Sequence, residues 1–211
     1  AWQLISTLLA NSYWPGFASG TIYQGAGKNV CVPFLNCYSC PGAVGSCPVG
    51  SFQFFLAGPG QTVSLYVLGT VTGVGALVGR LACGWLCPFG LIQELLHRLP
   101  SPKIFLPIWT RWIKYLVLAV FVLLLPALTT DAFGLGAPYF CKWLCPAGTL
   151  EAAIPLSIVN TDIRGALGAI FTWRLTWLLL IITLSIAVHR FFCQTLCPLG
   201  AIYSLFNRVS F

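Results

Sequence analysis

The ten cysteines of this chain are the side chains whose type and spacing could do chemistry, because thiolates are strong ligands for soft metals. Three pairs share the pattern CxxxCPxG, and a partial copy, CPVG, precedes them. The four copies start at Cys83, Cys141, Cys193 and Cys47. The similarity continues past the glycine, since the copies read CPVGSFQ, CPFGLIQ, CPAGTLE and CPLGAIY in chain order. The chain therefore contains a fourfold internal repeat.

Each repeat predicts a corner that presents sulfur atoms. Proline favours the first position of a helix and pushes the residue before it out of the helical region, so the cysteine before each proline becomes a helix N-cap. The free backbone N–H groups and the positive end of the helix dipole are expected to lower the pKa of that thiol. The first cysteine of a pair stands four residues earlier, so a full corner offers two sulfurs. One four-thiolate cluster then needs two corners.

Composition places these corners in a membrane protein. Of the 211 residues, 58% are hydrophobic and 7% are charged, and the mean hydropathy is +0.87. A soluble domain devotes roughly a quarter of its residues to charged side chains. The net charge of +7 is spread thinly between apolar segments and forms no continuous basic stripe, which excludes a nucleic-acid binder. The same hydrophobicity excludes a disordered chain.

Three apolar stretches are long enough to cross a bilayer, at 61–79, 114–130 and 166–189. Whether the N-terminal run 1–17 also crosses stays open, because polar and proline residues interrupt it. We therefore expect an all-α integral membrane protein with three to four transmembrane helices and short interfacial or re-entrant helices after each CPxG corner. Residues 1–211 would form a single domain that includes a cysteine-rich loop at 31–50.

The first predicted span carries four glycines with helical spacing. Gly69 and Gly73, and likewise Gly75 and Gly79, form small-xxx-small pairs. Such pairs let a neighbouring helix approach closely. A dinucleotide-binding loop is a poor interpretation of these glycines, because no strand precedes them and no acidic residue follows at the required distance.

Counting crossings assigns the corners to membrane faces. The corners at Cys83 and Cys193 fall on one face, which we call face A. This face gathers Cys83, Cys87, Cys193 and Cys197, the four thiolates that a [4Fe-4S] cluster requires. Arg80 and Arg190 each stand three residues before the first cysteine of these corners, so we expect them to act as cluster counter-charges. Lysine and arginine are also more frequent on face A, which the positive-inside rule makes cytoplasmic.

The opposite face, face B, holds the other six cysteines. Cys40, Cys47, Cys141 and Cys145 best complete a second cluster by analogy with face A. Cys31 and Cys37 are then left over, and three roles are open: ligands in place of other members, a disulfide, or a third centre with incomplete cysteine ligation. Because the hydrocarbon core is about 30 Å thick, clusters at its two surfaces would be too far apart for one fast electron transfer. We therefore expect them to be sunk inward or bridged.

Other interpretations carry less weight. Structural zinc uses paired cysteines in small polar knuckles, and a reducing cytoplasmic face disfavours a disulfide framework. Arg174 lies inside an apolar run, where it is either a counter-charge or, as we expect, a side chain that snorkels towards face B. Glu94 and Glu151 are expected on solvated helix faces. No CxxCH motif is present, so no haem is implied.

The CxxxCPxG corners resemble those of the membrane-bound 4Fe-4S binding proteins of the NapH/NosR type. These are bacterial polyferredoxins that pass electrons between quinols or ferredoxins and partner enzymes, and the likeness covers most of the chain. The segment Gly27–Gly50, which contains CVPFLNCYSCPGAVGSCPVG, is similar to a subgroup from anaerobic bacteria that adds a C-terminal dicluster ferredoxin. The resemblance makes the Cys31–Cys47 group the hallmark of that subgroup. It implies cluster ligation by Cys83, Cys87, Cys193, Cys197, Cys141 and Cys145.

The chain departs from the pattern of this family in two ways. It ends at Phe211, where the ferredoxin domain with its CxxCxxCxxxCP runs would begin, so we expect that this domain is either trimmed or replaced by a separate subunit. The covalent-flavin sequence of the larger NosR relatives is also absent, and no flavin is implied.

These observations predict a multi-pass electron-transfer protein of the bacterial cytoplasmic (inner) membrane. At least two [4Fe-4S] clusters would carry electrons between a cytoplasmic ferredoxin-like donor and an acceptor in or across the membrane, which makes the protein a carrier rather than a catalyst. Two alternatives stay open: a quinol dehydrogenase or quinone reductase subunit that binds a quinone, and a cluster-stapled membrane anchor or assembly protein for a redox complex. The expected partners are a ferredoxin domain or subunit, other redox membrane subunits and the lipid bilayer.

Overall fold

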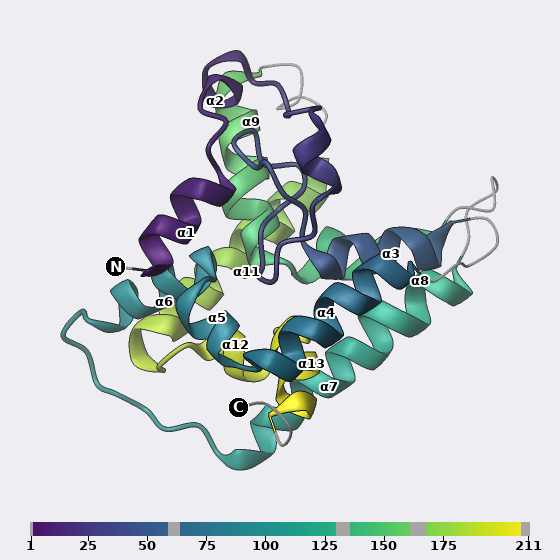
Figure 1. The fold of residues 1–211 in the computed structure, drawn as a ribbon. Coiled ribbons are helices and arrows are strands. Elements are labelled where there is room, and N and C mark those ends of the chain that lie inside the picture. Colours follow the sequence, from purple (N-terminus) through teal and green to yellow (C-terminus); the bar gives the residue numbers. More distant parts are fainter. Residues whose placement is uncertain (1, 59–63, 130–135, 161–167, 208–211) are drawn as a thin grey trace.

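The computed structural model describes residues 2–58, 64–129, 136–160 and 168–207. In these residues the chain is mostly helical and has no strand, and an isolated bridge joins Cys31 and Ser46. The elements are α1 (Trp2–Ala10), α2 (Pro15–Ser19), η1 (Ala26–Asn29), α3 (Pro48–Ala57), α4 (Leu65–Leu77), α5 (Leu81–Trp85), α6 (Pro88–His97), η2 (Ile108–Trp112), α7 (Ile113–Val117), η3 (Leu118–Leu124), α8 (Leu125–Leu128), η4 (Phe140–Leu144), η5 (Gly148–Ala153), α9 (Ile154–Val159), α11 (Gly168–Ala187), α12 (Phe191–Thr195) and α13 (Pro198–Phe206) (Figure 1). Of the η elements, η1 and η2 are 3₁₀ turns and η3, η4 and η5 are π-helical. The all-α prediction is confirmed for the described residues.

Two helices are long and apolar enough to cross a bilayer. One runs from Ile108 to Leu128 through η2, α7, η3 and α8, and the other is α11; they have 21 and 20 residues, or about 30 Å each. Only 22% and 17% of their most apolar stretches are buried inside the protein, so most of their apolar side chains face outward. A core helix of a soluble protein would be largely buried. The exposed apolar surface therefore favours contact with lipid.

The described residues support fewer spans than the sequence predicts. The predicted span 61–79 contains α4, which has 13 residues and a length of about 20 Å, while 61–63 lie outside the described residues. The N-terminal run forms α1 and α2, with 9 and 5 residues, and neither has the length of a span. Two of the three to four predicted transmembrane helices are thus supported.

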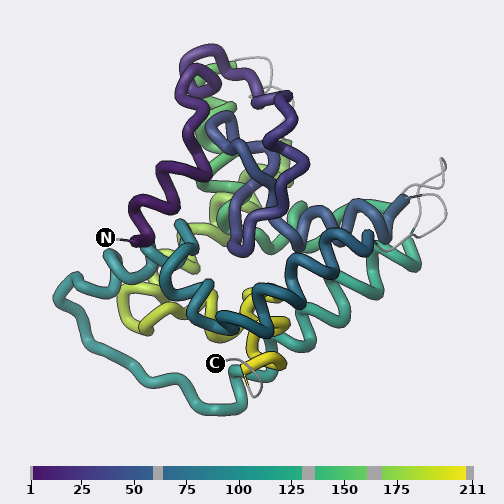
Figure 2. The backbone as a smooth tube through the Cα atoms, in the orientation of Figure 1, coloured from purple at the N-terminus to yellow at the C-terminus, as the bar shows by residue number. Residues whose placement is uncertain are grey.

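Figures 1 and 2 show two arms that meet at the cysteine corners. In one arm α3 packs against α4 and against η3 and α8. In the other arm α11 packs against η4 and η5, while α9 packs against α2. The short helices α5, α6, α12 and α13 lie where the arms converge, with α6 on α11 and with α13 on α4 and α7. The corners are therefore held by helices from the whole length of the chain.

The corners fold as the repeat predicts. Cys47, Cys87 and Cys197 are the N-caps of α3, α6 and α13, and each has an extended backbone followed by a proline in the first turn. Cys145 has the same extended conformation, with φ −76° and ψ 109°. The first cysteine of each pair lies on the short helix before the corner, which is α5, η4 or α12.

The glycine of CPxG lets a corner close on itself. A Cβ at Gly90 would lie 3.1 Å from the carbonyl oxygen of Cys83, and a Cβ at Gly200 would lie 3.1 Å from that of Cys193. Both distances are shorter than ordinary van der Waals contact. A side chain at these positions would therefore push apart the two cysteines of one corner.

The buried core is built by residues beside the corner cysteines. Phe140 and Phe192 directly precede a first cysteine and are both 0% exposed. The ring of Phe192 meets the ring of Phe89 from another corner edge to face, with centroids 5.3 Å apart. Packing of one corner against another thus forms the core, whereas the long helices contribute little of their surface to it.

Gly73 and Gly75 of α4 differ in what surrounds them. A Cβ at Gly75 would come 2.7 Å from Cδ2 of Phe206 on α13, whereas nothing lies within 4 Å of a Cβ at Gly73 or Gly69. In the described part of the chain, the predicted close helix approach is therefore not made at Gly69 and Gly73. It is made at Gly75.

Replacement of Gly75 by valine is expected to lower the free energy of unfolding by about 1–3 kcal/mol, because the added side chain must displace Phe206. Gly73→Val places the same side chain in open space and should unfold at the temperature of the wild type. Thermal unfolding of the detergent-solubilised variants measures the difference. Equal melting temperatures for the two variants would contradict this packing.

Candidate functional site

Four cysteines line one cavity of about 270 Å³ inside the protein. They are Cys83, Cys87, Cys193 and Cys197, which we call the first thiol group. They come from two corners that are distant in sequence, α5–α6 and α12–α13. Much of the remaining wall is apolar and is formed by Phe34, Leu35, Phe89, Phe192 and Leu199. The structure thus brings together the four cysteines that the sequence assigns to face A.

Gln93 holds the two corners of the first thiol group face to face. This side chain belongs to α6, is 1% exposed and reaches the opposite corner. Its Oε1 accepts a hydrogen bond from the backbone N–H of Phe192 at 3.0 Å, and its Nε2 donates to Sγ of Cys193 at 3.1 Å. One buried amide therefore fixes both the backbone before Cys193 and the sulfur of Cys193.

A second group of thiols repeats this arrangement. Gln53 of α3 is 0% exposed; its Oε1 accepts from the backbone N–H of Phe140 at 3.0 Å, and its Nε2 donates to Sγ of Cys141 at 3.7 Å. The thiols that interact here come from the corner of Cys47, the corner of Cys141 and Cys145, and the loop before α3. We call Cys37, Cys47, Cys141 and Cys145 the second thiol group. The two groups are thus built on one plan.

The structure places Cys37, rather than Cys40, beside the second corner pair. A Cβ at Gly148 would lie 3.6 Å from Sγ of Cys37 and 3.9 Å from Sγ of Cys145. Sγ of Cys40 instead donates to Oδ1 of Asn11 at 3.6 Å. The geometry therefore favours Cys37 in the position that the sequence analysis gave to Cys40. This follows because the partial corner at Cys47 lacks a cysteine four residues earlier, so the loop must supply the missing sulfur.

The remaining thiol, that of Cys31, is buried close to Cys47 and outside both groups. Its backbone N–H donates to the hydroxyl of Tyr66 at 3.4 Å. All ten cysteines belong to the described residues, and all ten are free thiols.

A polar residue stands six positions after the proline-flanked cysteine in all four corners, buried in three of them and half-buried in the corner of Cys145. Gln53 and Gln93 hold the corners as described, and the corresponding residues are Glu151 and Tyr203. Oε2 of Glu151 accepts from the backbone N–H of Cys37 at 2.9 Å, so the expectation of a solvated helix face for Glu151 is wrong. The hydroxyl of Tyr203 donates to the carbonyl oxygen of Pro33 at 2.9 Å. Alignment of the four repeats could have found these residues, because the shared position is polar in each copy.

Comparison with known proteins agrees with this repeated architecture. The family model described as "4Fe-4S binding domain" matches residues 60–107, 115–154 and 170–211, which together make up more than half of the chain. Each matched segment contains one full CxxxCPxG corner. The chain belongs to the 4Fe-4S binding domain family. No solved structure matches it.

Several curated proteins are similar to this chain. An uncharacterized protein of Methanocaldococcus jannaschii is 31% identical over 74% of this chain and 59% of its own length. The regulatory protein NosR of Pseudomonas aeruginosa is 29% identical over 71% of this chain and 19% of its own length. YccM of Escherichia coli, named provisionally as an electron transport protein, is 27% identical over 65% and 37%. The chain thus spans less than two thirds of the length of each of these relatives, and the resemblance to NosR-type proteins is confirmed.

Each thiol group of this 4Fe-4S domain has an arginine with an unsatisfied nitrogen. Among the described residues, Nε of Arg190 at the first group and Nε of Arg174 at the second are buried without a hydrogen-bond partner. Arg190 donates to the carbonyl oxygen of Gly84 at 3.2 Å and forms an ion pair with Glu94. Burial of an unpaired N–H of a charged group is costly. A cluster bound by four thiolates carries negative charge and would offset this cost.

Arg174 does not snorkel outward as the sequence analysis expected. Its guanidinium donates to the carbonyl oxygen of Cys141 at 3.3 Å and lies 3.1 Å from the position of a Cβ at Gly148. The counter-charge interpretation is therefore favoured for Arg174. Arg80 and Arg190 both line the cavity of the first thiol group, together with Arg111 and Lys114. Their action as counter-charges stays a prediction.

Burial favours the protonated form of the thiols in both groups. Burial, and then the neighbouring thiol of Cys193, raises the pKa of Cys83 to about 12. Burial, and then the carboxylate of Glu151, raises the pKa of Cys37 to about 12. The backbone N–H of Gly200 donates to Sγ of Cys197 at 3.4 Å, yet the pKa of Cys197 is raised because burial dominates. The predicted lowering of the pKa is thus wrong, and a metal must replace the protons.

The donor set fits a [4Fe-4S] cluster. Among the described residues, no three Cys, His, Asp or Glu side chains lie close enough together to hold a single metal ion. A cubane cluster does not require such close spacing, because its four thiolates bind four different irons. Four thiols around one cavity, two buried (Cys87 and Cys197) and two half-buried (Cys83 and Cys193), together with an apolar wall and an arginine with a free N–H, provide what this cluster requires.

A second, larger cavity of about 750 Å³ opens beside the first thiol group. It is lined by Trp2, Gln3, Trp85, Glu94 and Asn207 and shares Arg80 and Arg190 with the cavity of the thiols. His189 lines the cavity of the first thiol group, and its ring meets that of His97 edge to face, with ring centroids 5.3 Å apart. The larger cavity is therefore lined by polar and aromatic side chains and is adjacent to the cavity of the first thiol group.

Replacement of Gln93 by leucine is expected to lower the reduction potential of the cluster at the first thiol group, because loss of an N–H···S bond removes stabilisation of the reduced, more negative cluster. The cluster at the second thiol group should keep its potential. Gln53→Leu serves as the matched control: it should lower the reduction potential of the cluster at the second thiol group and leave that of the first unchanged. Redox titration followed by EPR measures both potentials. Equal changes at both clusters in either variant would contradict the assignment of one glutamine to each group.

Proposed function

We propose that this protein is a membrane electron carrier that binds one [4Fe-4S] cluster at each thiol group. The observation that carries the proposal is the repeated plan of two groups of four thiols, each beside an arginine whose buried Nε lacks a partner. Bound clusters of this type supply reversible one-electron exchange. The name of the relative YccM, which refers to electron transport, supports the same role.

The residues of the chain prepare the sites for this role. Phe34, Phe89 and Phe192 exclude water from the first thiol group. Gln53 and Gln93 fix the corners and donate N–H groups to sulfur, which favours the reduced state. Nothing in this arrangement presents a substrate to a nucleophile or to a general base, so the proposal assigns no bond chemistry to the protein.

The proposed ligands follow from the geometry of the two groups. Cys83, Cys87, Cys193 and Cys197 bind the first cluster, and Cys37, Cys47, Cys141 and Cys145 bind the second. Cys31 and Cys40 lie outside both sets. The number of clusters is therefore two in this proposal.

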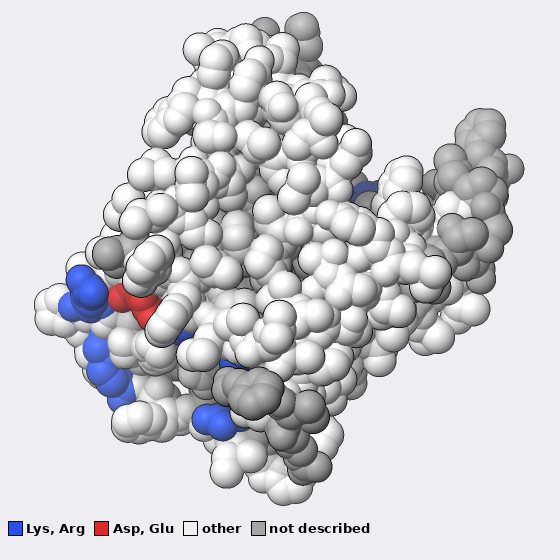
Figure 3. All heavy atoms as spheres, viewed as in Figure 1, with Lys and Arg blue, Asp and Glu red and all other residues white. Residues whose placement is uncertain are grey.

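The basic side of the molecule suits an acidic redox partner. Arg98, Lys103 and Arg111 are exposed, and Arg111 also lines the cavity of the first thiol group. Figure 3 shows that lysine and arginine gather on the lower part of the face in view, while its upper part is nearly free of charge. Opposite charges steer the encounter of redox partners. The donor in the proposal is a ferredoxin-like domain or subunit on the cytoplasmic side of the inner membrane, and the acceptor lies in or across the membrane.

The larger cavity supports a second candidate function, reduction or oxidation of a quinone. It lies at the wall of the first thiol group and offers Trp2 and Trp85 to an aromatic ring and Arg80 to a carbonyl oxygen. In that case a soluble quinol analogue reduces the clusters under anaerobic conditions without a protein donor. Reduction by dithionite but not by the quinol would count against this candidate.

Anaerobically purified protein is expected to contain about eight irons and eight acid-labile sulfides per chain, as two [4Fe-4S] clusters require. The double variant Cys83→Ser/Cys193→Ser should retain about four irons, because only the second group stays intact, and Cys47→Ser/Cys141→Ser should likewise retain about four. Metal analysis together with EPR after dithionite reduction makes the measurement. Zinc in place of iron would refute the proposed function.

Cys37 and Cys40 provide a matched pair for the ligand assignment. Cys37→Ser is expected to lose the second cluster, and thus about half of the iron, because Cys37 supplies its fourth sulfur. Cys40→Ser should keep the full iron content, since that thiol bonds to Asn11 instead. Iron loss in Cys40→Ser alone would restore the ligand set predicted from the sequence.

A further inference from the structure

The segment Pro33–Cys37 is a buried stretch of irregular backbone. Phe34, Leu35 and Asn36 are 5%, 3% and 0% exposed, although no helix or strand contains them. Loops usually run over the surface, because buried backbone N–H and C=O groups need partners. The partners of this segment therefore reveal what holds it inside.

The two thiol groups and their corner residues supply these partners. The carbonyl oxygen of Pro33 accepts from Tyr203, and the backbone N–H of Cys37 donates to Glu151. Between them, the backbone N–H of Leu35 interacts with the sulfur of Cys87 in the first thiol group. The next N–H, that of Asn36, interacts with the sulfur of Cys47 in the second thiol group. The amides of Leu35 and Asn36 thus interact electrostatically with sulfurs of different groups, and Leu35 lines the same cavity as Cys87.

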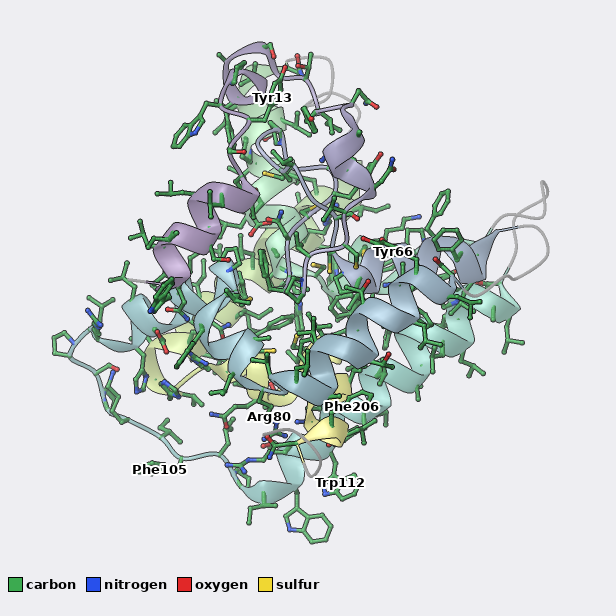
Figure 4. The ribbon with its side chains drawn as sticks, viewed as in Figure 1. Tyr13, Tyr66, Arg80, Phe105, Trp112 and Phe206 are labelled. Carbon is green, nitrogen blue, oxygen red and sulfur yellow. The ribbon has the colours of Figure 1, made fainter. Side chains whose placement is uncertain are left out.

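The positions of the side chains agree with this placement. Phe34 and Leu35 line the cavity of the first thiol group, whereas Cys37, two residues further along, belongs to the second. Consecutive Cα atoms are about 3.8 Å apart, so the change from one group to the other takes place over one or two residues. The two thiol groups are therefore neighbours, and one length of irregular backbone lies between them. In Figure 4 the sulfur atoms gather in the middle of the molecule, where the arms meet.

Tyr203 fixes the segment from the side of the first corner pair. It is 0% exposed, donates to Pro33 and interacts with thiols of both groups, Cys83 and Cys47 among them. A side chain in this position restrains the backbone that separates the groups. Electron transfer depends steeply on distance and proceeds well through short paths of covalent and hydrogen bonds.

We propose that the Leu35–Asn36 backbone couples the two cluster sites, so that an electron passes directly between them along Cys87, this backbone and Cys47. This inference rests on the proposed function. In the step, one cluster loses one electron and the other gains it, while no bond forms or breaks and no proton moves. The cysteine-rich loop thus has a second role besides supplying Cys37.

EPR of the native, cluster-loaded protein tests the coupling. Each double variant, Cys83→Ser/Cys193→Ser or Cys47→Ser/Cys141→Ser, contains one cluster and provides the spectrum of that cluster alone. The fully reduced native protein is expected to show a broadened or split spectrum that differs from the sum of these two, because neighbouring unpaired spins interact. A native spectrum equal to the sum, with both clusters present by iron analysis, would overturn this inference and leave the proposed function intact. A protein without two clusters would overturn both.

A pair of variants at Leu35 tests the path itself. Leu35→Pro removes the N–H that faces Cys87, and Leu35→Ala shortens the side chain but keeps that N–H. After reduction with less than one equivalent of dithionite, freeze-quenched samples should show slower redistribution of the electron in Leu35→Pro than in Leu35→Ala. Equal rates in these two variants would overturn the path. Should Leu35→Pro fail to bind clusters, the native spectrum still decides whether the sites are coupled.

Discussion

A four-thiol site can exist in this chain only because two corners are held face to face, and a buried glutamine does this in each group. Gln93 and Gln53 accept from the backbone before a first cysteine and donate to the sulfur of that cysteine. Replacement of both bonds by water is impossible in a core from which water is excluded, so the glutamine must find its partners in the opposite corner. The short helices, the buried phenylalanines and the closely packed glycines all follow from this apposition.

Charge is the second constraint on the architecture. Thiols buried among apolar side chains favour their protonated form, and the structure raises the pKa of Cys83 and Cys37 accordingly. Negative charge at these sites therefore needs a metal and compensating cations. The chain places Arg190 and Arg174 there and leaves one buried N–H of each without a partner. Arg174 lies on α11, one of the two helices long and apolar enough to cross a membrane, and its guanidinium is directed to the carbonyl oxygen of Cys141 inside the protein, the side on which an arginine of such a helix is tolerated.

The cysteine-rich loop contacts both thiol groups and so connects the two sites. In this loop the segment Pro33–Cys37 has no regular structure; Tyr203 donates to the carbonyl oxygen of Pro33, and Glu151 accepts from the backbone N–H of Cys37. The sequence places the groups on opposite faces of a membrane, which would separate them by the thickness of the bilayer. In the structure the two groups are not separated in this way, because they lie on the two sides of the same loop.

The sequence by itself determined the helical class, the fourfold repeat, the N-cap cysteines and the pairing of the Cys83 and Cys193 corners, since proline, glycine and hydrophobic length act locally or through the order of the spans. Only the tertiary structure placed Cys37 rather than Cys40 beside Cys145, turned Arg174 and Glu151 towards the thiols, and limited the supported spans to two. These features depend on which distant backbone groups a side chain can reach once the corners have packed. Spacing along the chain carries no information on such contacts, and the analogy with the other corners therefore favoured Cys40, whereas the loop places the sulfur of Cys37 beside Gly148.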